Sequence, residues 1–191
     1  RQDGVTTVLL RELVFEDFGV YRGRQTIDLC PPTPDRPIVL FGGLNGAGKT
    51  TLLKGLNLVL YGKRAVGVGR TRADYDFYLR EAIYRGAAET KGAALELLFD
   101  ATHDGVPAEF RVRRYWNVGS DGRVLDHLAV FHNGDKSAFL TDHWDEVVEE
   151  ILPLEISSLF FFDGEKIEAL AAPEKASHVT KTAIESLLGL S

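Results

Sequence analysis

The sequence predicts an α/β fold in which a glycine-rich loop joins a short strand to a helix, with an antiparallel β subdomain beside that helix. The first observation is the order of patterns in residues 38–60, where an apolar run, a glycine cluster and a helix-periodic segment follow one another. The second is a set of three strand-like runs separated by turn signals at residues 104–105 and 121–122. The third is composition, because 191 residues that are 45% hydrophobic and 26% charged suit one well-packed globular domain.

The loop itself reads GLNGAGKT from Gly43 and matches the pattern G-x-x-x-x-G-K-[ST] in full. Its glycines let the backbone curl so that successive N–H groups point at one anion, and the helix that follows adds its unpaired N–H groups. Lys49 suits the β- and γ-phosphates of a nucleotide, and the hydroxyl of Thr50 suits a magnesium ion. An ordinary glycine turn before a helix is disfavoured, because strand and helix patterns flank the loop.

Charge and cysteine content restrict the function classes. The net charge is −6, so the surface as a whole does not favour nucleic acid, and any DNA contact must come from a local patch. The single cysteine, Cys30, excludes an internal disulfide and fits the cytoplasm. No apolar run approaches the roughly 18 residues that span a membrane, so no membrane partner is predicted. Because methionine is absent and the last helical pattern has no clear stop, we expect a fragment of a longer protein.

The first elements follow from local patterns. Residues 5–15 predict a long strand, and residues 25–29 predict its hairpin partner after a bend at Phe18-Gly19. Prolines make residues 30–37 a loop, and the strand before the glycine loop is expected at residues 38–41.

The later elements are predicted in the same way. A helix is expected over residues 74–84, after a glycine- and arginine-rich stretch at 63–72. The strands of the antiparallel meander are expected at residues 93–100, 108–116 and 125–133.

The C-terminal third is expected to be mostly helical. A helix over residues 142–152 ends at Pro153, with an apolar stripe on one side and acidic residues on the other. An apolar strand is expected at residues 159–162, a short helix at 166–172 and a last helix at 175–188.

The position of a second acidic residue is compatible with two classes of P-loop protein, a self-contained enzyme and a split head. A hydrolysing P-loop enzyme needs a carboxylate after a second strand, to hold magnesium and to polarise water. In a self-contained NTPase or kinase, Asp163 would be that Walker B residue and Glu165 the base. In a split head, the true Walker B strand comes from a distant part of the protein. We favour the split head, because the sequence contains no S-G-G-type signature turn.

Several blocks carry a family resemblance. The loop motif, together with LVFEDFGVY at residues 13–21, resembles the heads of the SMC and Rad50 group of ABC ATPases. Three blocks narrow this resemblance to the DndD group, the ATPases of bacterial DNA phosphorothioate modification: FGVYRG from Phe18, LYGKRA from Leu60 and FFFDGEKI from Phe160. The resemblance covers nearly the whole chain.

The resemblance implies a fold and partners. Residues 1–174 would form the N-terminal lobe of an ABC- or SMC-type head, and residues 175–191 the base of a coiled coil leading to the protein's own C-terminal lobe. ATP and Mg²⁺ would lie between two heads of a homodimer. ATP binding and hydrolysis would drive DNA handling with other Dnd proteins. A generic DNA-repair ATPase of the SMC and Rad50 type, and a nucleotide-gated scaffold that does not depend on hydrolysis, remain alternatives.

The resemblance also implies site residues. Beside Gly43, the phosphates would be bound by Asn45, Gly46, Ala47, Gly48, Lys49, Thr50 and Thr51. The bend at Gly19 and Val20 would lie near the nucleotide, and Arg64 would touch its base, ribose or phosphates. Lys49 and Asp163 would be catalytic, and Thr50 and Asp163 would contact the metal. Asp163 stands where the group usually has the water-orienting Gln, although its carboxylate still offers magnesium an oxygen ligand.

Several residues outside the loop are candidates for DNA or metal contacts. Arg111, Arg113 and Arg114 are predicted on a strand face opposite Phe110 and Val112, where they would form either a track for a DNA backbone or, as we favour, a solvated surface. Packing is likewise favoured over base stacking for the aromatic pair at residues 115–116. The five histidines show no ligand-like spacing, so no zinc site is predicted.

Overall fold

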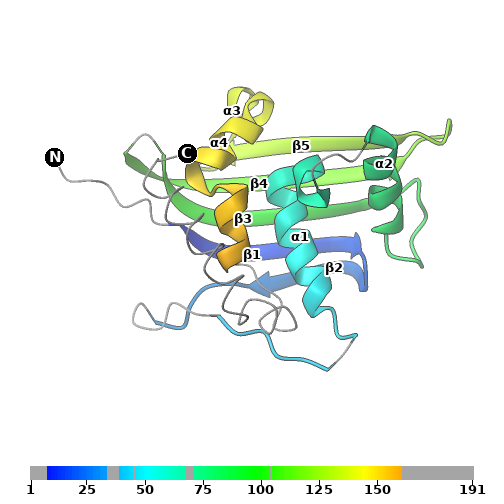
Figure 1. Ribbon diagram of the computed structural model, residues 1–191, viewed down its shortest axis with the longest axis horizontal. Coiled ribbons are helices and arrows are strands. Elements are labelled where there is room, and N and C mark those ends of the chain that lie inside the picture. The colour runs from blue at the N-terminus through cyan, green and yellow to red at the C-terminus, as the bar shows by residue number, and fades with distance from the viewer. Residues whose placement is uncertain (1–7, 34–38, 45, 68–70, 104, 161–191) are drawn as a thin grey trace, which may run out of the picture. The chain divides into compact units, whose positions relative to one another are not determined.

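The computed structural model describes residues 8–33, 39–44, 46–67, 71–103 and 105–160. The chain divides into two compact units, Arg1–Ile151 and Leu152–Ser191. The first unit contains a sheet with helices on it, and the described part of the second contains one helix (Figure 1).

The sheet of the first unit is antiparallel throughout its described strands, in the order β2-β1-β3-β4-β5-β6. Its strands are β1 Leu9–Phe18, β2 Tyr21–Asp28, β3 Ala93–His103, β4 Val106–Val118, β5 Val124–His132 and β6 Asp135–Ser137. The predicted hairpin and the predicted meander are both confirmed. They also share one sheet, because β1 pairs with β3, with Leu13 opposite Leu97.

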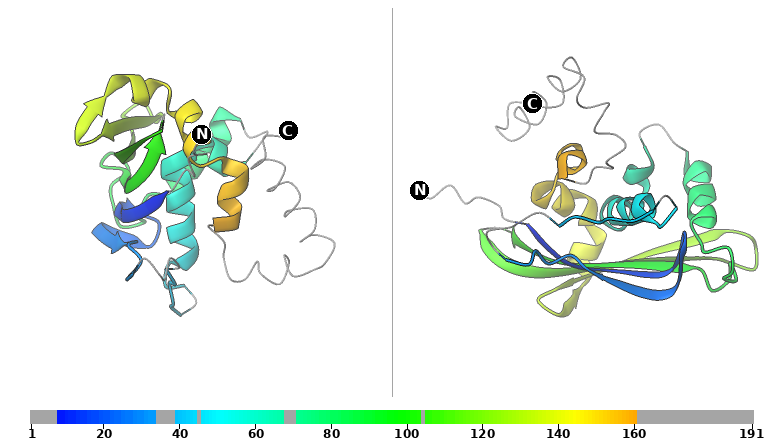
Figure 2. Two further views of the ribbon diagram at one scale, coloured as in Figure 1. Left: turned by 90° about the vertical axis from the view of Figure 1, so that its left-hand side faces the viewer. Right: turned by 90° about the horizontal axis from the view of Figure 1, so that it is seen from below.

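Helices cover one face of this sheet. They are α1 Lys49–Tyr61, the 3-10 helix η1 Gly62–Val66, α2 Arg72–Glu81, α3 Ala138–Asp142 and α4 Trp144–Ile151. Figure 2 shows α1 and α2 on the same side of the sheet. Gly55 lets α1 approach closely, because a Cβ there would lie 2.6 Å from Cε1 of Phe15. The helix predicted after the glycine loop is confirmed as α1. The helix predicted over residues 74–84 is confirmed as α2, which ends at Glu81 and buries Tyr75 and Leu79.

Two tryptophans tie the helices to the core. The indole N–H of Trp116 donates to the carbonyl of Leu79 in α2 at 2.8 Å, and that of Trp144 donates to the carbonyl of Leu60 in α1 at 2.8 Å. Both rings are buried. Such a ring contributes apolar burial and also satisfies a polar group, so the packing predicted for Trp116 is confirmed. The same prediction is wrong for Tyr115, whose side chain is 42% exposed, because adjacent strand residues point to opposite sides of the sheet.

The strand predicted before the glycine loop is absent from the described residues. Residues 39–41 form no strand and pair with none of the described strands, and the side chain of Leu40 is 89% exposed. A strand needs a neighbour for its N–H and C=O groups, and the described sheet provides none for this segment. The local apolar pattern suits a strand, but it does not specify a neighbouring strand with which residues 39–41 could pair.

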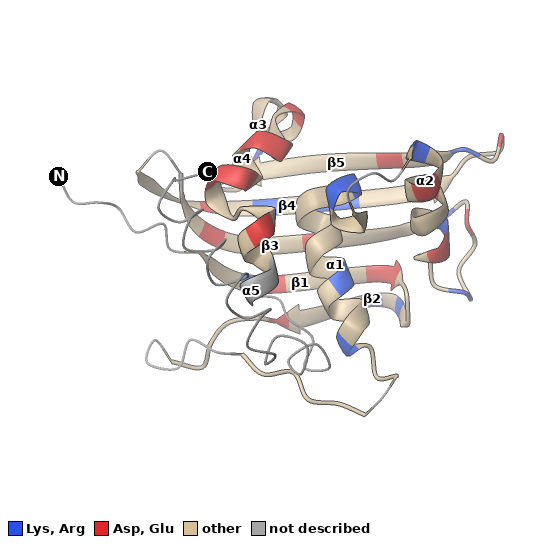
Figure 3. Cartoon of the chain, viewed as in Figure 1, with Lys and Arg blue, Asp and Glu red and all other residues tan. Residues whose placement is uncertain are grey.

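The helix predicted over residues 142–152 is confirmed as α4, and a short helix that the sequence did not predict, α3, precedes it and ends just before His143. The apolar stripe of α4 is confirmed, because Trp144, Val147, Val148 and Ile151 are buried. Figure 3 shows acidic residues, coloured red, along the same helix. None of the described helices is long and apolar enough to cross a membrane.

In the second unit, α5 Leu154–Phe160 corrects another prediction. The N–H groups of Ile156 and Ser157 donate to the carbonyl of Pro153 at 3.1 and 3.0 Å, so a helix begins here and runs through Phe160. The predicted strand at residues 159–162 is therefore wrong in its first half, because a short apolar run does not distinguish a strand from a helix. Asp163, Glu165 and the elements predicted from residue 161 onwards lie outside the described residues.

Candidate functional site

The glycine loop curls immediately before α1. Gly46 has φ of 83° and Gly48 has φ of 99°, both in the left-handed region that favours glycine. The N–H of Ala47 donates to the carbonyl of Leu44 at 3.1 Å, which closes the turn. Gly48 is the N-cap of α1, so the curl delivers the chain directly into the helix.

The ammonium group of Lys49 lies inside the curl. Its Nζ donates to the carbonyl of Gly43 at 2.7 Å and to that of Leu44 at 3.0 Å. The lysine therefore points back over the loop that precedes it. A phosphate placed in the same curl would meet this positive charge.

The first turn of α1 also favours an anion. It contains no acidic side chain, and the first N–H groups of any helix lack partners within the helix. Together with the positive end of the helix dipole, they attract negative charge. Thr50 is exposed in this turn. The loop, Lys49 and the hydroxyl of Thr50 thus fit a nucleotide triphosphate with magnesium, whereas Asn45 lies outside the described residues.

The bend between β1 and β2 lies against this turn. A Cβ on Gly19 would come within 2.5 Å of Cγ2 of Thr51, and a Cβ on Gly48 would come within 3.0 Å of Cγ2 of Val20. The structure therefore brings Gly19 and Val20 to the loop. Their contact with a nucleotide, which the resemblance implies, stays a prediction.

Arg64 is not brought to the loop. It lies in η1 beyond the far end of α1, and a helix of 13 residues is about 20 Å long. Its guanidinium pairs with Glu149 and donates to the carbonyl of Asp145 at 3.3 Å. In this structure Arg64 therefore connects η1 to α4, and the predicted proximity to nucleotide is not seen.

Asp17 was missed at the level of sequence. It is 5% exposed, has φ of 49°, and accepts a 2.7 Å hydrogen bond from the N–H of Gly23 and another from the ammonium of Lys91. Its carbonyl accepts the N–H of Tyr84 at 2.7 Å. A carboxylate just before a glycine bend was the only available signal, since Lys91 and Tyr84 are remote in sequence.

Replacing Asp17 should change how the free energy of unfolding depends on pH in the acid range. The hydrogen bond from Lys91, followed by that from Gly23, holds the pKa of the Asp17 carboxyl below its usual range. A lowered folded-state pKa contributes stability above the unfolded-state pKa, and this contribution is lost as the pH falls through the folded-state value. We expect Asp17→Asn to be less stable than the parent near neutral pH, with the difference shrinking as the pH falls below about 4.

Urea unfolding at a series of pH values measures this difference. Asp142→Asn, at an exposed position in α3, serves as the control and should change the free energy of unfolding little at every pH. A constant difference between Asp17→Asn and the parent down to acid pH would contradict the prediction.

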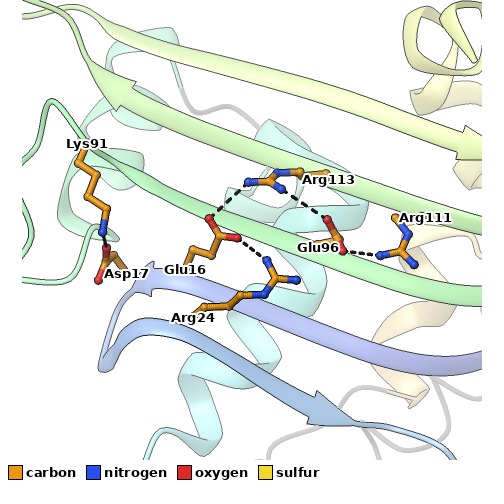
Figure 4. A network of polar contacts seen from close by, with 7 residues as sticks. All are labelled: Glu16, Asp17, Arg24, Lys91, Glu96, Arg111 and Arg113. Carbon is orange, nitrogen blue, oxygen red and sulfur yellow. Dashed lines mark hydrogen bonds and ion pairs between the residues drawn. The ribbon is translucent and has the colours of Figure 1, made fainter. Parts of the chain in front are cut away.

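The face of the sheet opposite α1 carries an ion-pair network (Figure 4). Glu96 accepts Arg111 at 2.7 Å and lies 3.7 Å from Arg113, and Glu16 pairs with both Arg113 and Arg24. Each arginine of the network thus faces a carboxylate. This balance favours the solvated surface over a DNA track, because the counter-charges are already supplied by the protein.

The prediction that Arg114 shares that face is wrong. Adjacent strand residues point to opposite sides, so Arg114 lies on the same side as Val112 and faces the helices. It is 7% exposed and donates to Asp126 at 3.0 Å, while its guanidinium packs on Gly62, where a Cβ would lie 2.7 Å from Nη2. Arg114 therefore stabilises the end of α1 inside the protein.

Comparison with known proteins adds one match. The family described as an AAA domain matches residues 12–187, a span that includes the loop, α1 and the whole described sheet except its first residues. No curated protein matches the chain. Within the described residues, no group of three or more His, Cys, Asp or Glu side chains is placed to hold a metal ion.

Proposed function

Since the chain belongs to the AAA domain family, an SMC-like family of P-loop ATPases, we propose that residues 43–51 bind ATP with Mg²⁺ and take part in ATP hydrolysis. Family membership points to ATP binding and hydrolysis in general. The observation that carries the assignment to this loop is the ammonium of Lys49, which lies inside a curl of glycines at the start of α1.

Each residue of the loop has a proposed role. Backbone N–H groups bind the phosphates, from Asn45, Gly46, Ala47, Gly48, Lys49, Thr50 and Thr51. Lys49 adds a positive charge where negative charge accumulates during phosphoryl transfer. Thr50 offers its hydroxyl to magnesium, which neutralises phosphate charge when bound. Gly19 and Val20 line the site beside Thr51, and Asp163 is proposed to contact the metal and the attacking water.

The head is proposed to be split, with the protein's own C-terminal lobe completing it. Support comes from the residues that precede and begin the loop, where Leu40 and Leu44 are 89% and 86% exposed and Phe41 is 37% exposed. Exposure of apolar side chains to water is unfavourable, and a segment that pairs with none of the described strands still has backbone N–H and C=O groups with which to join another sheet. Two completed heads would then form a homodimer around ATP, as the sequence resemblance implies.

Catalytic activity of the isolated chain tests the split head. Purified as residues 1–191, it should bind ATP with Mg²⁺ but hydrolyse it slowly, because a Walker B carboxylate and a signature turn are supplied by other segments. Addition of the C-terminal lobe of the same protein should raise the rate. Brisk turnover by the chain alone, proportional to its concentration, would contradict the split head and favour a self-contained enzyme.

The cellular process is proposed to be DNA phosphorothioate modification in the bacterial cytoplasm, with other Dnd proteins as partners and DNA as the object. The support is the sequence resemblance of the blocks from Phe18, Leu60 and Phe160 to the DndD group. Replacing Lys49 by Ala in the intact protein of a host that carries phosphorothioate linkages should reduce their content in digested DNA. An unchanged content, with the variant expressed normally, would direct attention to the generic DNA-repair alternative.

A further inference from the structure

We propose that Tyr21 is a positioning residue that holds the phosphate loop in its anion-binding shape, and that Asp17 fixes the turn from which Tyr21 extends. The inference rests on the proposed function of the loop and adds to it a second layer of residues. Neither side chain belongs to the loop motif, and both come from the β1–β2 hairpin.

Tyr21 contacts the backbone of Gly48 directly. The hydroxyl of Tyr21 donates to the carbonyl of Gly48 at 3.1 Å. The same carbonyl accepts the N–H of Leu52 at 2.8 Å, which is the first hydrogen bond of α1. The carbonyl of Gly48 is thus held from two directions, once by the helix and once by the hairpin.

The planarity of the peptide bond turns this contact into control of a phosphate donor. In a trans peptide the C=O of one residue and the N–H of the next are rigidly opposed. Fixing the carbonyl of Gly48 therefore fixes the direction of the N–H of Lys49, one of the proposed phosphate donors. Gly48 needs this restraint, because glycine at φ of 99° has more backbone freedom than any other residue.

The ring of Tyr21 is itself held. It stacks on Phe15 with ring centroids 4.3 Å apart and an interplanar angle of 16°. Phe15 is buried beneath α1. Partial burial raises the pKa of the Tyr21 hydroxyl, so the group stays a donor throughout the neutral range.

The turn before Tyr21 is anchored to the rest of the protein on its other side. Asp17 binds Gly23 and Lys91 through its carboxylate, as Figure 4 shows for Lys91. The N–H of Gly19 donates to the carbonyl of Ala82 at 2.7 Å. These contacts of Asp17 and Gly19 fix the turn on the side away from the loop. Tyr21 therefore extends from a rigid turn when it holds the carbonyl of Gly48.

Tyr21→Phe tests the proposal, with Tyr115→Phe as the matched control. Both variants lose one hydroxyl and keep the ring, but Tyr115 stacks on His127 on the face of the sheet opposite α1. Loss of one net hydrogen bond predicts that Tyr21→Phe binds Mg-ATP about 2- to 10-fold more weakly by calorimetry. Affinity for tripolyphosphate should fall by the same factor, because the effect passes through phosphate donors. Tyr115→Phe should bind as the parent does.

Hydrogen exchange distinguishes a local effect of Tyr21 on the loop from a general effect on the stability of the fold. In Tyr21→Phe, the amide of Lys49 should exchange faster than in the parent, while amides in β3 and β4 keep their protection. Asp17→Ala should weaken Mg-ATP binding more than Asp17→Asn does, because Asn still accepts the N–H of Gly23 and tolerates positive φ. Uniform loss of protection across the sheet would overturn the proposal.

The outcomes separate this inference from the proposed function. If Lys49→Ala abolishes binding while Tyr21→Phe matches the parent, the loop binds nucleotide and the positioning role is wrong. If the parent binds neither Mg-ATP nor tripolyphosphate, the proposed function fails, and the exchange of the Lys49 amide alone decides whether Tyr21 restrains the loop.

Discussion

Lys49→Ala is expected to weaken binding of Mg-ATP by about 10- to 100-fold, the loss of a charge-assisted contact of about 1.5 to 3 kcal/mol. The reason is geometric, because the ammonium lies within the curl, bonded to the carbonyls of Gly43 and Leu44. Without it, those carbonyls line the site and repel phosphate oxygens. Isothermal titration with ATP, ADP and AMP measures the loss, which should be largest for ATP and smallest for AMP.

Lys54→Ala provides the control for charge alone. Lys54 is an exposed lysine of the same helix, five positions further along, and its removal changes net charge by the same amount. It should leave the affinity for ATP within about twofold of the parent, because exposed charges are screened by salt. Equal losses in Lys49→Ala and Lys54→Ala would mean that the loop attracts nucleotide only through long-range charge, and the site assignment would be wrong.

Phe15→Ala is expected to destabilise the first unit by about 3 to 5 kcal/mol, the usual loss for a buried phenylalanine. Its ring lies in the middle of the interface between β1 and α1, against Gly55, and stacks on Phe18 at 5.7 Å as well as on Tyr21. Truncation leaves a cavity that α1 cannot fill without leaving the sheet. Urea unfolding followed by circular dichroism measures the change, which is a large fraction of the stability of a typical domain.

Phe77→Ala tests whether this effect belongs to the interface. Phe77 is also a phenylalanine, but it lies in α2 and is 66% exposed. Its removal should change the free energy of unfolding by no more than about 0.5 kcal/mol. A similar small change for Phe15→Ala would contradict the close packing of α1 on β1.

The parts of the fold that local sequence determines were predicted well. The glycine loop and α1 were found because their motif and their periodicity lie within one short stretch, and the strands of the meander because turn residues separate them. The pairing of β1 with β3 is different, since it depends on contacts between segments far apart in sequence. No pattern within β1 specifies which strand will lie on its second edge.

The errors have the same physical origin. Residues 39–41 have the composition of a buried strand, yet a strand exists only where a partner completes its hydrogen bonds, and the described residues contain none for them. The short apolar run at Leu159 and Phe160 is compatible with the periodicity of a strand or of a helix. In the structure these residues belong to α5, which begins with hydrogen bonds to the carbonyl of Pro153. Within the site, Asp17 and Tyr21 could not be assigned, because their partners become neighbours only after folding.

The place of β1 between β2 and β3 has a consequence for how the polypeptide reaches its native state. Arg11 of β1 and its ion-pair partner Asp100 of β3 are separated by 89 residues. The edge of β1 that pairs with β3 therefore stays unpaired until the intervening residues have been synthesised. Closing such a loop costs entropy that nearby contacts do not repay, which slows folding relative to a chain of local hairpins. A ribosome-bound intermediate would expose one edge of its first hairpin until β3 emerges, and that interval is when chaperone protection against aggregation matters most.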